Sequence, residues 1–237
     1  DLRMMDIALG GQGAPIVPVG EKLLLKEYAY LLNIGGISNI SANKLSGIVA
    51  YDICAANRVL NMLCNEVEKA YDDGGRMAAS GQLNTALLNE LNALTYYQQP
   101  YPKSLANHFG IEQVYPIVQS YQLSVLDALR TYTEHIAIQV GNAINNLQAH
   151  NPLPNAKLLV TGGGAHNQFL INRIAQALQT YSIELVVPDI QLIDYKEALV
   201  MGLLAVLRWQ EENTVLHSVT GARRSSIGGA LWIGQEA

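Results

Sequence analysis

The stretch LLVTGGGAHN at residues 158–167 decides the fold, because it joins an apolar strand to a helix through three consecutive glycines. Free N–H groups and the helix dipole at such a junction attract phosphate, and glycine lets a ligand approach the backbone closely. A plain tight turn is the alternative explanation, but three glycines in a row exceed what a turn requires. We therefore expect Gly162, Gly163, Gly164 and Asn167 to contact a nucleotide, with Asn167 also capping the helix.

The residues around this stretch predict a layered α/β domain with parallel strands. A helix is expected over residues 167–180, a strand over residues 183–187 and a second helix over residues 195–210. Upstream, residues 120–148 form one long helical pattern with a single apolar stripe. That stripe is explained equally well by the domain's own core and by a partner copy of the chain.

Three short runs rich in Ile, Leu, Val and Tyr precede the helical segments. They lie at residues 28–36, 37–43 and 46–53, and are broken by Gly35-Gly36 and by residues 43–47. This spacing predicts a three-stranded antiparallel meander. Helices are expected from Asn57, as a possible cap, and over residues 83–94. A meander leading into parallel strands indicates a mixed five-stranded ribonuclease-H-like sheet with flanking helices.

The composition is that of a soluble globular protein. Of the 237 residues, 49% are hydrophobic and 15% are charged, and the formal net charge of −5 carries no basic cluster typical of nucleic-acid binding. The longest apolar runs are far shorter than the roughly 20 residues of a membrane helix. Cys54 and Cys64 lack metal-ligand spacing and suit the reducing cytoplasm. The five histidines also lack metal spacing, so we expect them at surface or loop positions and not as metal ligands.

Asp52 is the candidate acid–base residue. It follows the apolar residues 48–51, and we expect it at the carboxyl end of that strand, where ligands of open α/β sheets bind. A carboxylate there could accept a proton from an attacking hydroxyl or water during phosphoryl transfer. It could equally cap a turn before the next helix. Gly35-Gly36 is a weak signal alone, but it could hold phosphates if it faced the glycines of residues 162–164.

Further polar residues could bind a substrate. Glu197 is expected one turn into the last helix, where it could bind a sugar hydroxyl, although the residues alone favour a role in complementing the helix dipole. Arg3 and Asp6 flank the glycine-rich segment at residues 6–21, and Lys103-Ser104 lies in an irregular stretch. Considered individually, each of Arg3, Asp6, Lys103 and Ser104 would be interpreted as a solvated surface residue.

Taken together, these segments resemble the anhydro-N-acetylmuramic acid kinases in their order along the chain. The matching pieces are DIALGGQGAPIVPVGE at residues 6–21, LLNIGGISNIS at 31–41, YD at 51–52, YDDGG at 71–75, PKS at 102–104, TGGGAHN at 161–167, KEALVMGLLA at 196–205 and SVTGA at 218–222.

The resemblance implies the second half of an actin-like ATPase or sugar kinase fold. Residues 1–25 would end the first domain and its hinge, and residues 26–237 would form the second domain. It also implies a cytoplasmic, homodimeric enzyme of peptidoglycan recycling, which opens the 1,6-anhydro ring with water and transfers the γ-phosphoryl of ATP to O6, with Mg²⁺. Asp52 aligns with the catalytic base. Arg3, Asp6, Glu197, Lys103 and Ser104 would bind the sugar, and Gly35, Gly36, Gly162, Gly163, Gly164 and Asn167 the nucleotide.

Two departures from the family pattern qualify this expectation. The family's opening MSGTSLDG-type segment and its HGQT segment are missing from these residues, so we expect a fragment with little kinase activity of its own. After the base, the family reads aspartate, threonine, glycine, proline, glycine, asparagine, whereas this chain has Asp52-Ile53-Cys54-Ala55-Ala56-Asn57. The alternative to a divergent active enzyme is a non-catalytic descendant that binds sugar or nucleotide.

Overall fold

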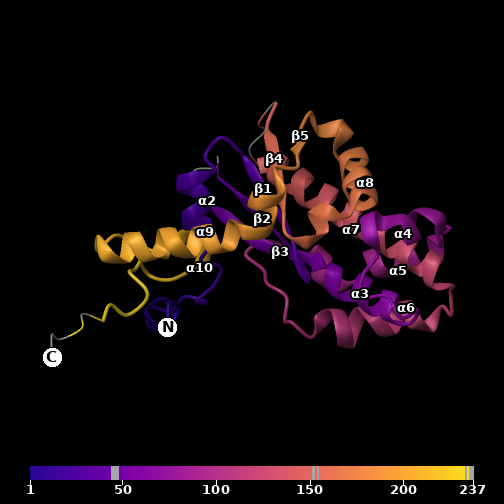
Figure 1. The fold of residues 1–237 in the computed structure, drawn as a ribbon, viewed down its shortest axis with the longest axis horizontal. Coiled ribbons are helices and arrows are strands. Elements are labelled where there is room, and N and C mark those ends of the chain that lie inside the picture. Colours follow the sequence, from indigo (N-terminus) through magenta and orange to yellow (C-terminus); the bar gives the residue numbers. More distant parts are fainter. Residues whose placement is uncertain (44–47, 151–152, 154, 233, 235–237) are drawn as a thin grey trace.

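A five-stranded mixed sheet carries the fold, with the strands in the order β3-β2-β1-β4-β5 (Figure 1). β1 pairs antiparallel with β2 and β2 with β3, while β1 and β4, and β4 and β5, run parallel. This confirms the predicted ribonuclease-H-like sheet. The strands are β1 (Tyr30–Ile34), β2 (Ile37–Ala42), β3 (Val49–Ala55), β4 (Lys157–Thr161) and β5 (Glu184–Val186).

The computed structural model describes residues 1–43, 48–150, 153, 155–232 and 234. The sequence predicts a break between two strands at residues 43–47, and residues 44–47 of it lie outside the described part. None of the helices within it is long and apolar enough to cross a membrane.

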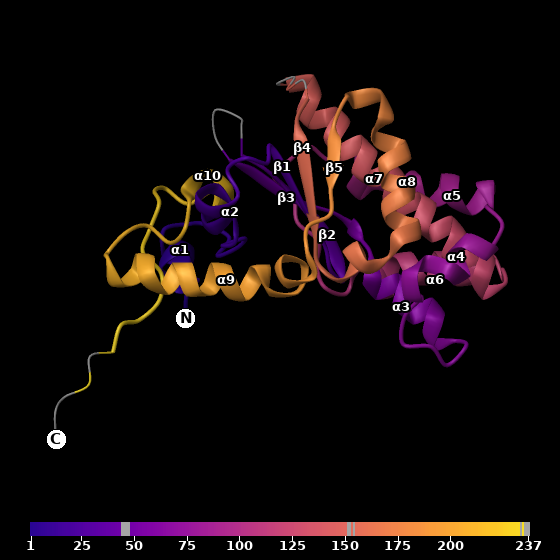
Figure 2. The same cartoon turned by 45° about the horizontal axis from the view of Figure 1, so that its top comes forward.

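Most helices form one layer on one face of the sheet (Figure 2). They are α3 (Asn57–Asn65), α4 (Arg76–Ser80), α5 (Thr85–Asn92), α6 (Tyr115–Ser120), α7 (Val125–His150) and α8 (Gln168–Leu178). Short 3-10 turns lie at η1 (Asp73–Gly75), η2 (Thr95–Gln98), η4 (Gly163–His166) and η5 (Gln179–Tyr181), and η3 (Gly110–Val114) is a π-helical turn.

The alternation of side chains along the strands builds a core on each face of the sheet. Tyr30 and Leu32 of β1 belong to the main core beneath the helical layer. Leu31, between them, packs with Leu159 of β4 and with Leu25 on the opposite face. The sheet is therefore buried on both sides at its centre, which explains the nearly continuous apolar runs of β1 and β4.

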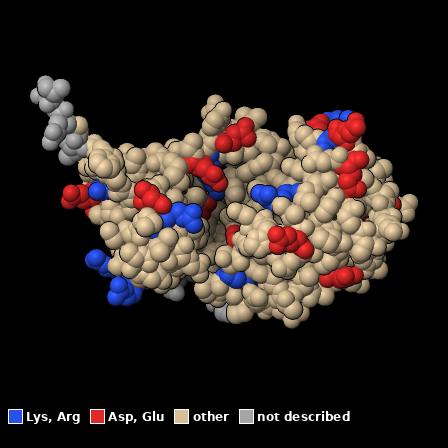
Figure 3. Space-filling model, turned by 90° about the horizontal axis from the view of Figure 1, so that it is seen from below, with Lys and Arg blue, Asp and Glu red and all other residues tan. Residues whose placement is uncertain are grey.

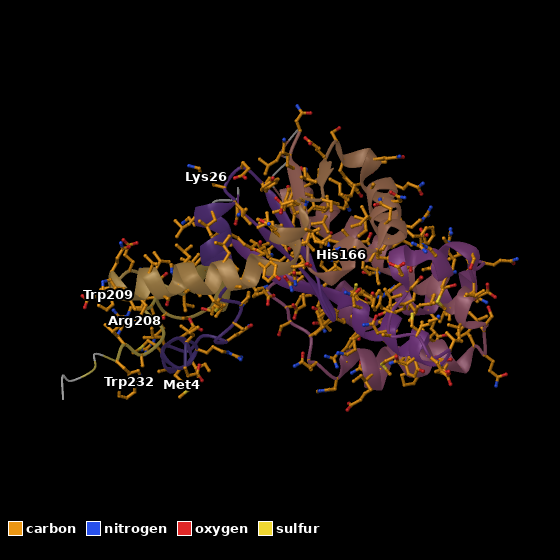
Figure 4. All side chains as sticks on the ribbon, in the orientation of Figure 1. Met4, Lys26, His166, Arg208, Trp209 and Trp232 are labelled. Atoms are coloured by element: carbon orange, nitrogen blue, oxygen red, sulfur yellow. The ribbon has the colours of Figure 1, made fainter. Side chains whose placement is uncertain are left out.

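A small lobe lies beside the sheet on its other face. It consists of α1 (Met4–Ala8), α2 (Pro18–Leu24), α9 (Ile190–Trp209) and α10 (His217–Thr220) (Figures 1 and 2). Its own core joins α2 to α9 through Val19, Val200, Leu204 and Leu207. The end of α9 projects away from the sheet, and Trp209 there is 70% exposed (Figure 4). Segments near the two ends of the chain thus pack together, since Gln12 N donates to Thr220 O and Arg223 N to Leu9 O. A domain boundary at residue 25 stays a prediction.

The single helix predicted over residues 120–148 is wrong in its first part. α6 ends at Ser120 and α7 begins at Val125, and Gln122 between them has a positive φ of 49°. A helix cannot continue through that conformation. Within α7, Leu129, Ile136 and Val140 are fully buried in the main core. These three residues of the apolar stripe are therefore used by the protein's own core, whereas Leu126 is 39% exposed.

Two predicted helix starts and one predicted surface histidine are also corrected. α9 begins at Ile190, five residues before the expected start, because the side chain of Asp189 accepts a hydrogen bond from Leu192 N and caps it. Asn57 is the first residue of α3 and does not cap it. His135, expected at the surface, is fully buried in α7.

Candidate active site

A cleft of about 650 Å³ lies between the small lobe and the β3 edge of the sheet. Figure 3 looks into this hollow and shows acidic and basic side chains around it. The cleft brings together five of the residues singled out in the sequence, which are Arg3, Asp52, Lys103, Ser104 and Glu197. These residues come from four separate segments, so residues that are distant in the sequence lie close together in the fold.

Asp52 lies in the middle of β3, and the prediction that it ends the strand or caps a turn is wrong. The register between β2 and β3 shifts next to it, because Ser38 pairs with Cys54 and Asn39 with Asp52. Such a bulge re-aims a side chain and is frequent beside active sites. The half-buried Asp52 carboxylate consequently lines the cleft.

Three backbone-linked hydrogen bonds fix Asp52 in place. Leu105 N donates to its Oδ2 at 2.8 Å, Asp52 N donates to Lys103 O at 3.2 Å, and the Tyr96 hydroxyl donates to Asp52 O at 2.6 Å. Burial raises the pKa of the Asp52 carboxyl, and the bond from Leu105 N opposes part of that effect. Among the described residues no hydrogen bond reaches Oδ1, so this oxygen is available to a ligand in the cleft.

Lys103 is held against two tyrosines at the rim of the cleft. Its Nζ lies 4.6 Å from the ring centroid of Tyr96 and 5.9 Å from that of Tyr51, and donates to Tyr96 O at 3.2 Å. Burial lowers the pKa of this amino group. Ser104 follows on the same exposed segment and also lines the cleft. Tyr96, which touches both Asp52 and Lys103, carried no signal in the sequence.

Glu197 lies inside α9, well beyond its first turn, so the helix-dipole explanation for it is wrong. Its neighbour Lys196 points into the protein and forms an ion pair with Glu21 of α2, with Nζ 2.8 Å from Oε1. Ser41 of β2 donates its hydroxyl to the other oxygen of Glu21. This network holds α9 against α2 and the sheet, so that Glu197 faces the cleft.

Arg3 and Asp6 take different positions around the glycine-rich segment. Arg3 lines the cleft and donates from Nε to Gly13 O at 3.0 Å. Asp6 is fully buried, and its two oxygens accept hydrogen bonds from Gly13 N at 2.8 Å and from Thr220 Oγ1 at 2.7 Å. In the described structure Asp6 therefore shapes the loop and is not part of the cleft lining.

A second pocket, of about 490 Å³, lies at the start of α3 and α8. Of the predicted nucleotide residues, Gly163 and Asn167 line it, and Asn167 also caps α8 by accepting from Leu170 N. Asn57, Asn61 and Tyr71 complete much of its wall. Amide groups and an exposed aromatic ring are suited to a nucleoside, which offers donors, acceptors and a flat face.

The other two glycines of the triplet are required by packing. Gly162 has a positive φ of 81°, and a side chain at Gly164 would collide with Ile34 of β1. The glycine segment is also tied to α9, because His166 lies 2.9 Å from Asp194 Oδ1. Only the middle glycine of the three therefore presents an exposed backbone to the second pocket.

The Gly35-Gly36 turn lies between the two pockets. Asn57 N donates to Gly35 O at 3.0 Å on the side of the second pocket, and Asn33, two residues before the turn, lines the cleft. The side chain of Arg58 lies over Gly36 and supplies a cation that no sequence pattern singled out. A ligand that extends from one pocket to the other would pass this turn.

A comparison with known protein families identifies the family of this chain. The profile of the family described as "Anhydro-N-acetylmuramic acid kinase" matches residues 1–234 of the chain. The chain belongs to this family.

Two curated relatives are named anhydro-N-acetylmuramic acid kinase. The protein of Aliivibrio fischeri is 34% identical over 238 residues, covering 98% of this chain and 64% of the relative. That of Coxiella burnetii is 31% identical over 244 residues, covering 100% of this chain and 64% of the relative. Among solved structures, one match is the activator of the 2-hydroxyisocaproyl-CoA dehydratase from Clostridium difficile with bound ADPNP. Its TM-score is 0.44 at 17% identity, and the match covers 78% of this chain and 67% of that one. The chain thus spans about two thirds of the curated relatives' length.

The segment after Asp52, where this chain differs from the expected kinase pattern, is ordinary buried strand. Ile53, Cys54 and Ala55 complete β3 and are at most 3% exposed, and Ala56 is fully buried at the start of α3. The Cys54 thiol lies 3.2 Å from the Ser38 hydroxyl. Asn57 keeps its place beside the second pocket and donates to Ile34 O at 3.1 Å.

Proposed function

We propose that this chain supplies the catalytic base, the nucleotide pocket and a large part of the sugar cleft of a kinase. The reaction is conversion of 1,6-anhydro-N-acetylmuramic acid to N-acetylmuramic acid 6-phosphate, with ATP as phosphoryl donor and water opening the ring. The observation that carries this proposal is the position of Asp52 and Glu197 in one cleft, with the Gly35-Gly36 turn between that cleft and the second pocket. Family membership supports the choice of sugar.

The sugar would lie in the cleft beside Asp52. Glu197, Lys103 and Ser104 offer charged and hydroxyl groups to the polar ring and its acid side chain, and Arg3 adds a second cation. Asp6 would act through the glycine-rich loop that it fixes, since Gly13 carries the carbonyl that Arg3 contacts. Its contribution to sugar binding would therefore be one of positioning.

ATP would lie in the second pocket with its phosphates directed past Gly35-Gly36. Gly163 and Asn167 would contact the nucleotide directly, while Gly162 and Gly164 let the turn between β4 and α8 pack against the end of β1. Arg58 would face the phosphates. Mg²⁺ typically enters such sites on the phosphates and retains several waters. Since the described residues contain no group of three or more His, Cys, Asp or Glu placed for a metal, we assign no residue to hold it.

Asp52 would remove a proton from the water that attacks the anhydro bridge. A general base works best when its pKa is near the operating pH, and burial shifts the pKa of Asp52 in that direction. The bond from Leu105 N occupies Oδ2 and leaves Oδ1 to accept the proton. Water would add to C1 of the sugar as the C1–O6 bond breaks. O6 would then bond to the γ-phosphorus of ATP as the bond to the β–γ bridging oxygen breaks and ADP leaves, so the remaining catalysis is positioning.

The test is a coupled ADP-release assay on the protein expressed from its whole gene, with ATP, Mg²⁺ and anhydro-N-acetylmuramic acid. We expect turnover, and a loss of about 100-fold or more in Asp52→Asn, the usual contribution of a general base. Glu197→Gln should raise KM for the sugar about tenfold and leave KM for ATP unchanged, whereas Glu211→Gln, outside α9 and the cleft, should change neither. The 237-residue chain alone should be nearly silent. A folded whole-gene protein that releases no ADP with this sugar would contradict the proposal.

The second candidate is a non-catalytic protein that binds sugar or nucleotide. It is favoured by the segment after Asp52, where the buried, apolar Ile53 stands at the position of the threonine in the family pattern. This candidate predicts saturable binding of ATP or sugar by calorimetry without ADP release. The cytoplasmic location, the homodimer and the division of the chain at residue 25 stay predictions that accompany the kinase proposal.

A further inference from the structure

A separate groove of about 390 Å³ lies on the opposite side of the β3 edge from Asp52. Its floor is formed by Tyr51 and Ile53 of β3, which face the helical layer. One wall is α7, and the other is the segment of residues 97–101, which begins within η2. The groove is lined by Tyr51, Ile53, Tyr97, Gln98, Gln99, Pro100, Tyr101, Lys103, Gln139, Asn142, Ala143 and Asn146.

Neutral amides dominate the polar lining of this groove. Gln98 and Gln99 stand on one wall, and Gln139, Asn142 and Asn146 face them from α7 at the spacing of one helix face. Each amide carries both a donor and an acceptor, although the buried Gln139 already donates from Nε2 to Asn92 Oδ1 at 2.8 Å. Lys103 is the one charged residue among the lining residues, and its amino group already donates to Tyr96 O. The groove is therefore suited to an uncharged ligand with many hydroxyl or amide groups.

An aromatic pair gives the groove an apolar surface beside these amides. The rings of Tyr51 and Tyr101 stack with centroids 5.4 Å apart and an interplanar angle of 9°. The Tyr51 hydroxyl reaches Ala143 O of α7 at 3.4 Å, which fixes the ring between strand and helix. Tyr51 is 6% exposed, so the aromatic surface open to the groove is that of the half-buried Tyr97 and Tyr101. Such a surface flanked by amides matches a sugar ring, which has an apolar C–H face and a rim of hydroxyl groups.

The strand edge beside the groove is not open to an extended peptide. Asp52 N donates to Lys103 O, and Leu105 N is bound by the Asp52 carboxylate, so residues 103–105 already cover this edge of β3. Addition of a peptide as a further strand requires free backbone groups. The groove is also short, since 390 Å³ is at the low end of the about 300–1,000 Å³ of ligand pockets.

We propose that this amide-lined groove binds a neutral pyranose unit, at a site distinct from the cleft that contains Asp52. Tyr51 and Lys103 line both hollows, so a sugar bound here would contact the segment that fixes Asp52. The proposal does not depend on the kinase reaction, because the amides that carry it line the groove and not the cleft.

The test is titration of the whole-gene protein with N-acetylglucosamine, followed by isothermal calorimetry and by amide chemical shifts. Asn142→Ala should weaken binding about fivefold, the effect of one lost hydrogen bond. Asn145→Ala is the matched control, because Asn145 is exposed on the same helix and does not line the groove. Both substitutions replace asparagine by a better helix former, so neither should unfold α7.

A third variant separates the two sites. Glu197→Gln removes a cleft carboxylate, and it should leave affinity for this probe unchanged if the sugar lies in the groove. The proposal is overturned if no saturable binding occurs at millimolar probe, if Asn142→Ala and Asn145→Ala behave alike, or if Glu197→Gln alone weakens binding. Binding of an alanine tripeptide in place of the sugar would also overturn it.

Discussion

Lys196 Nζ lies 2.8 Å from Glu21 Oε1, and the two residues are 3% and 5% exposed where α9 packs against α2. Ser41 of β2 donates to the second oxygen of Glu21. Each charge thus has its counter-charge or a hydrogen bond, as buried ions require. The pair connects residues far apart in sequence and joins the small lobe to the sheet at the floor of the cleft.

We expect Lys196→Met to lower the free energy of unfolding by about 3–5 kcal/mol, because it leaves the Glu21 carboxylate buried without its partner. Glu21→Gln combined with Lys196→Met removes both charges and should recover most of the loss. Urea denaturation of the single and double variants measures this. A loss below about 1 kcal/mol in the single variant would mean that water reaches Glu21.

Within the glycine triplet, we expect Gly163 to contribute to nucleotide binding and its neighbour Gly164 to packing. Gly164→Ala should lower stability by about 1–3 kcal/mol, because its Cβ would enter the space of Ile34. Gly163→Ala has its nearest neighbour at 3.5 Å, Asn57 Nδ2, and should change stability by less than about 0.5 kcal/mol. We expect it instead to weaken ATP binding, measured by calorimetry. Equal loss of stability in both variants would contradict this assignment.

The fold could be predicted from sequence where its signals are local. The short apolar runs and their glycine breaks define β1 to β4, and the Asn167 cap and the apolar period define α8. The start of α9 was locally encoded too, since Asp189 follows Pro188 and caps Leu192 N, a signal that the apolar run beyond it concealed. The helix break after Ser120 has no comparable signal. Gln122 has a positive φ there, and glutamine is not a residue type that marks such a conformation in a sequence.

The site was predictable in its residue types but not in its geometry. Asp52, Glu197 and Lys103 could be selected because they lie in recognisable segments, and the cleft contains all three. The bulge that aims Asp52 arises from pairing with β2 and is invisible in a single strand. The partnership of Glu21 with Lys196 spans 175 residues, so no local spacing could reveal it.

Asp52→Asn should separate catalysis from stability. Because burial raises the folded-state pKa of Asp52, its ionised form destabilises the folded protein above that pKa, and the effect disappears as pH falls. The asparagine oxygen can still accept from Leu105 N. At pH 7 we therefore expect a thermal midpoint equal to or above that of the parent, together with loss of turnover. A lower midpoint at pH 7 would show that the carboxylate charge is stabilising.

His135 should make the protein acid-sensitive through the unfolded state. Burial lowers its folded-state pKa to about 3, while an unfolded histidine keeps a pKa of about 6.5. Its Nδ1 lies 2.7 Å from Asn92 Oδ1 and its Nε2 lies 3.0 Å from the Tyr97 hydroxyl. This fits a neutral ring that donates to the amide oxygen and accepts from the tyrosine.

Stability from His135 is present above pH 6.5 and decreases as pH falls from 6.5 towards 3, because the unfolded chain binds a proton that the folded one excludes. The His135 contribution to the slope of the free energy of unfolding against pH should approach about 1.4 kcal/mol per pH unit. His135→Gln keeps a donor and an acceptor but cannot titrate. The free energy of unfolding, measured by urea denaturation, should therefore fall less steeply between pH 6.5 and 5 in this variant, by the His135 contribution to the slope. His217→Gln, at the exposed start of α10, is the control and should retain the parent's slope. An unchanged slope in His135→Gln would show that the buried imidazole accepts a proton in the folded state.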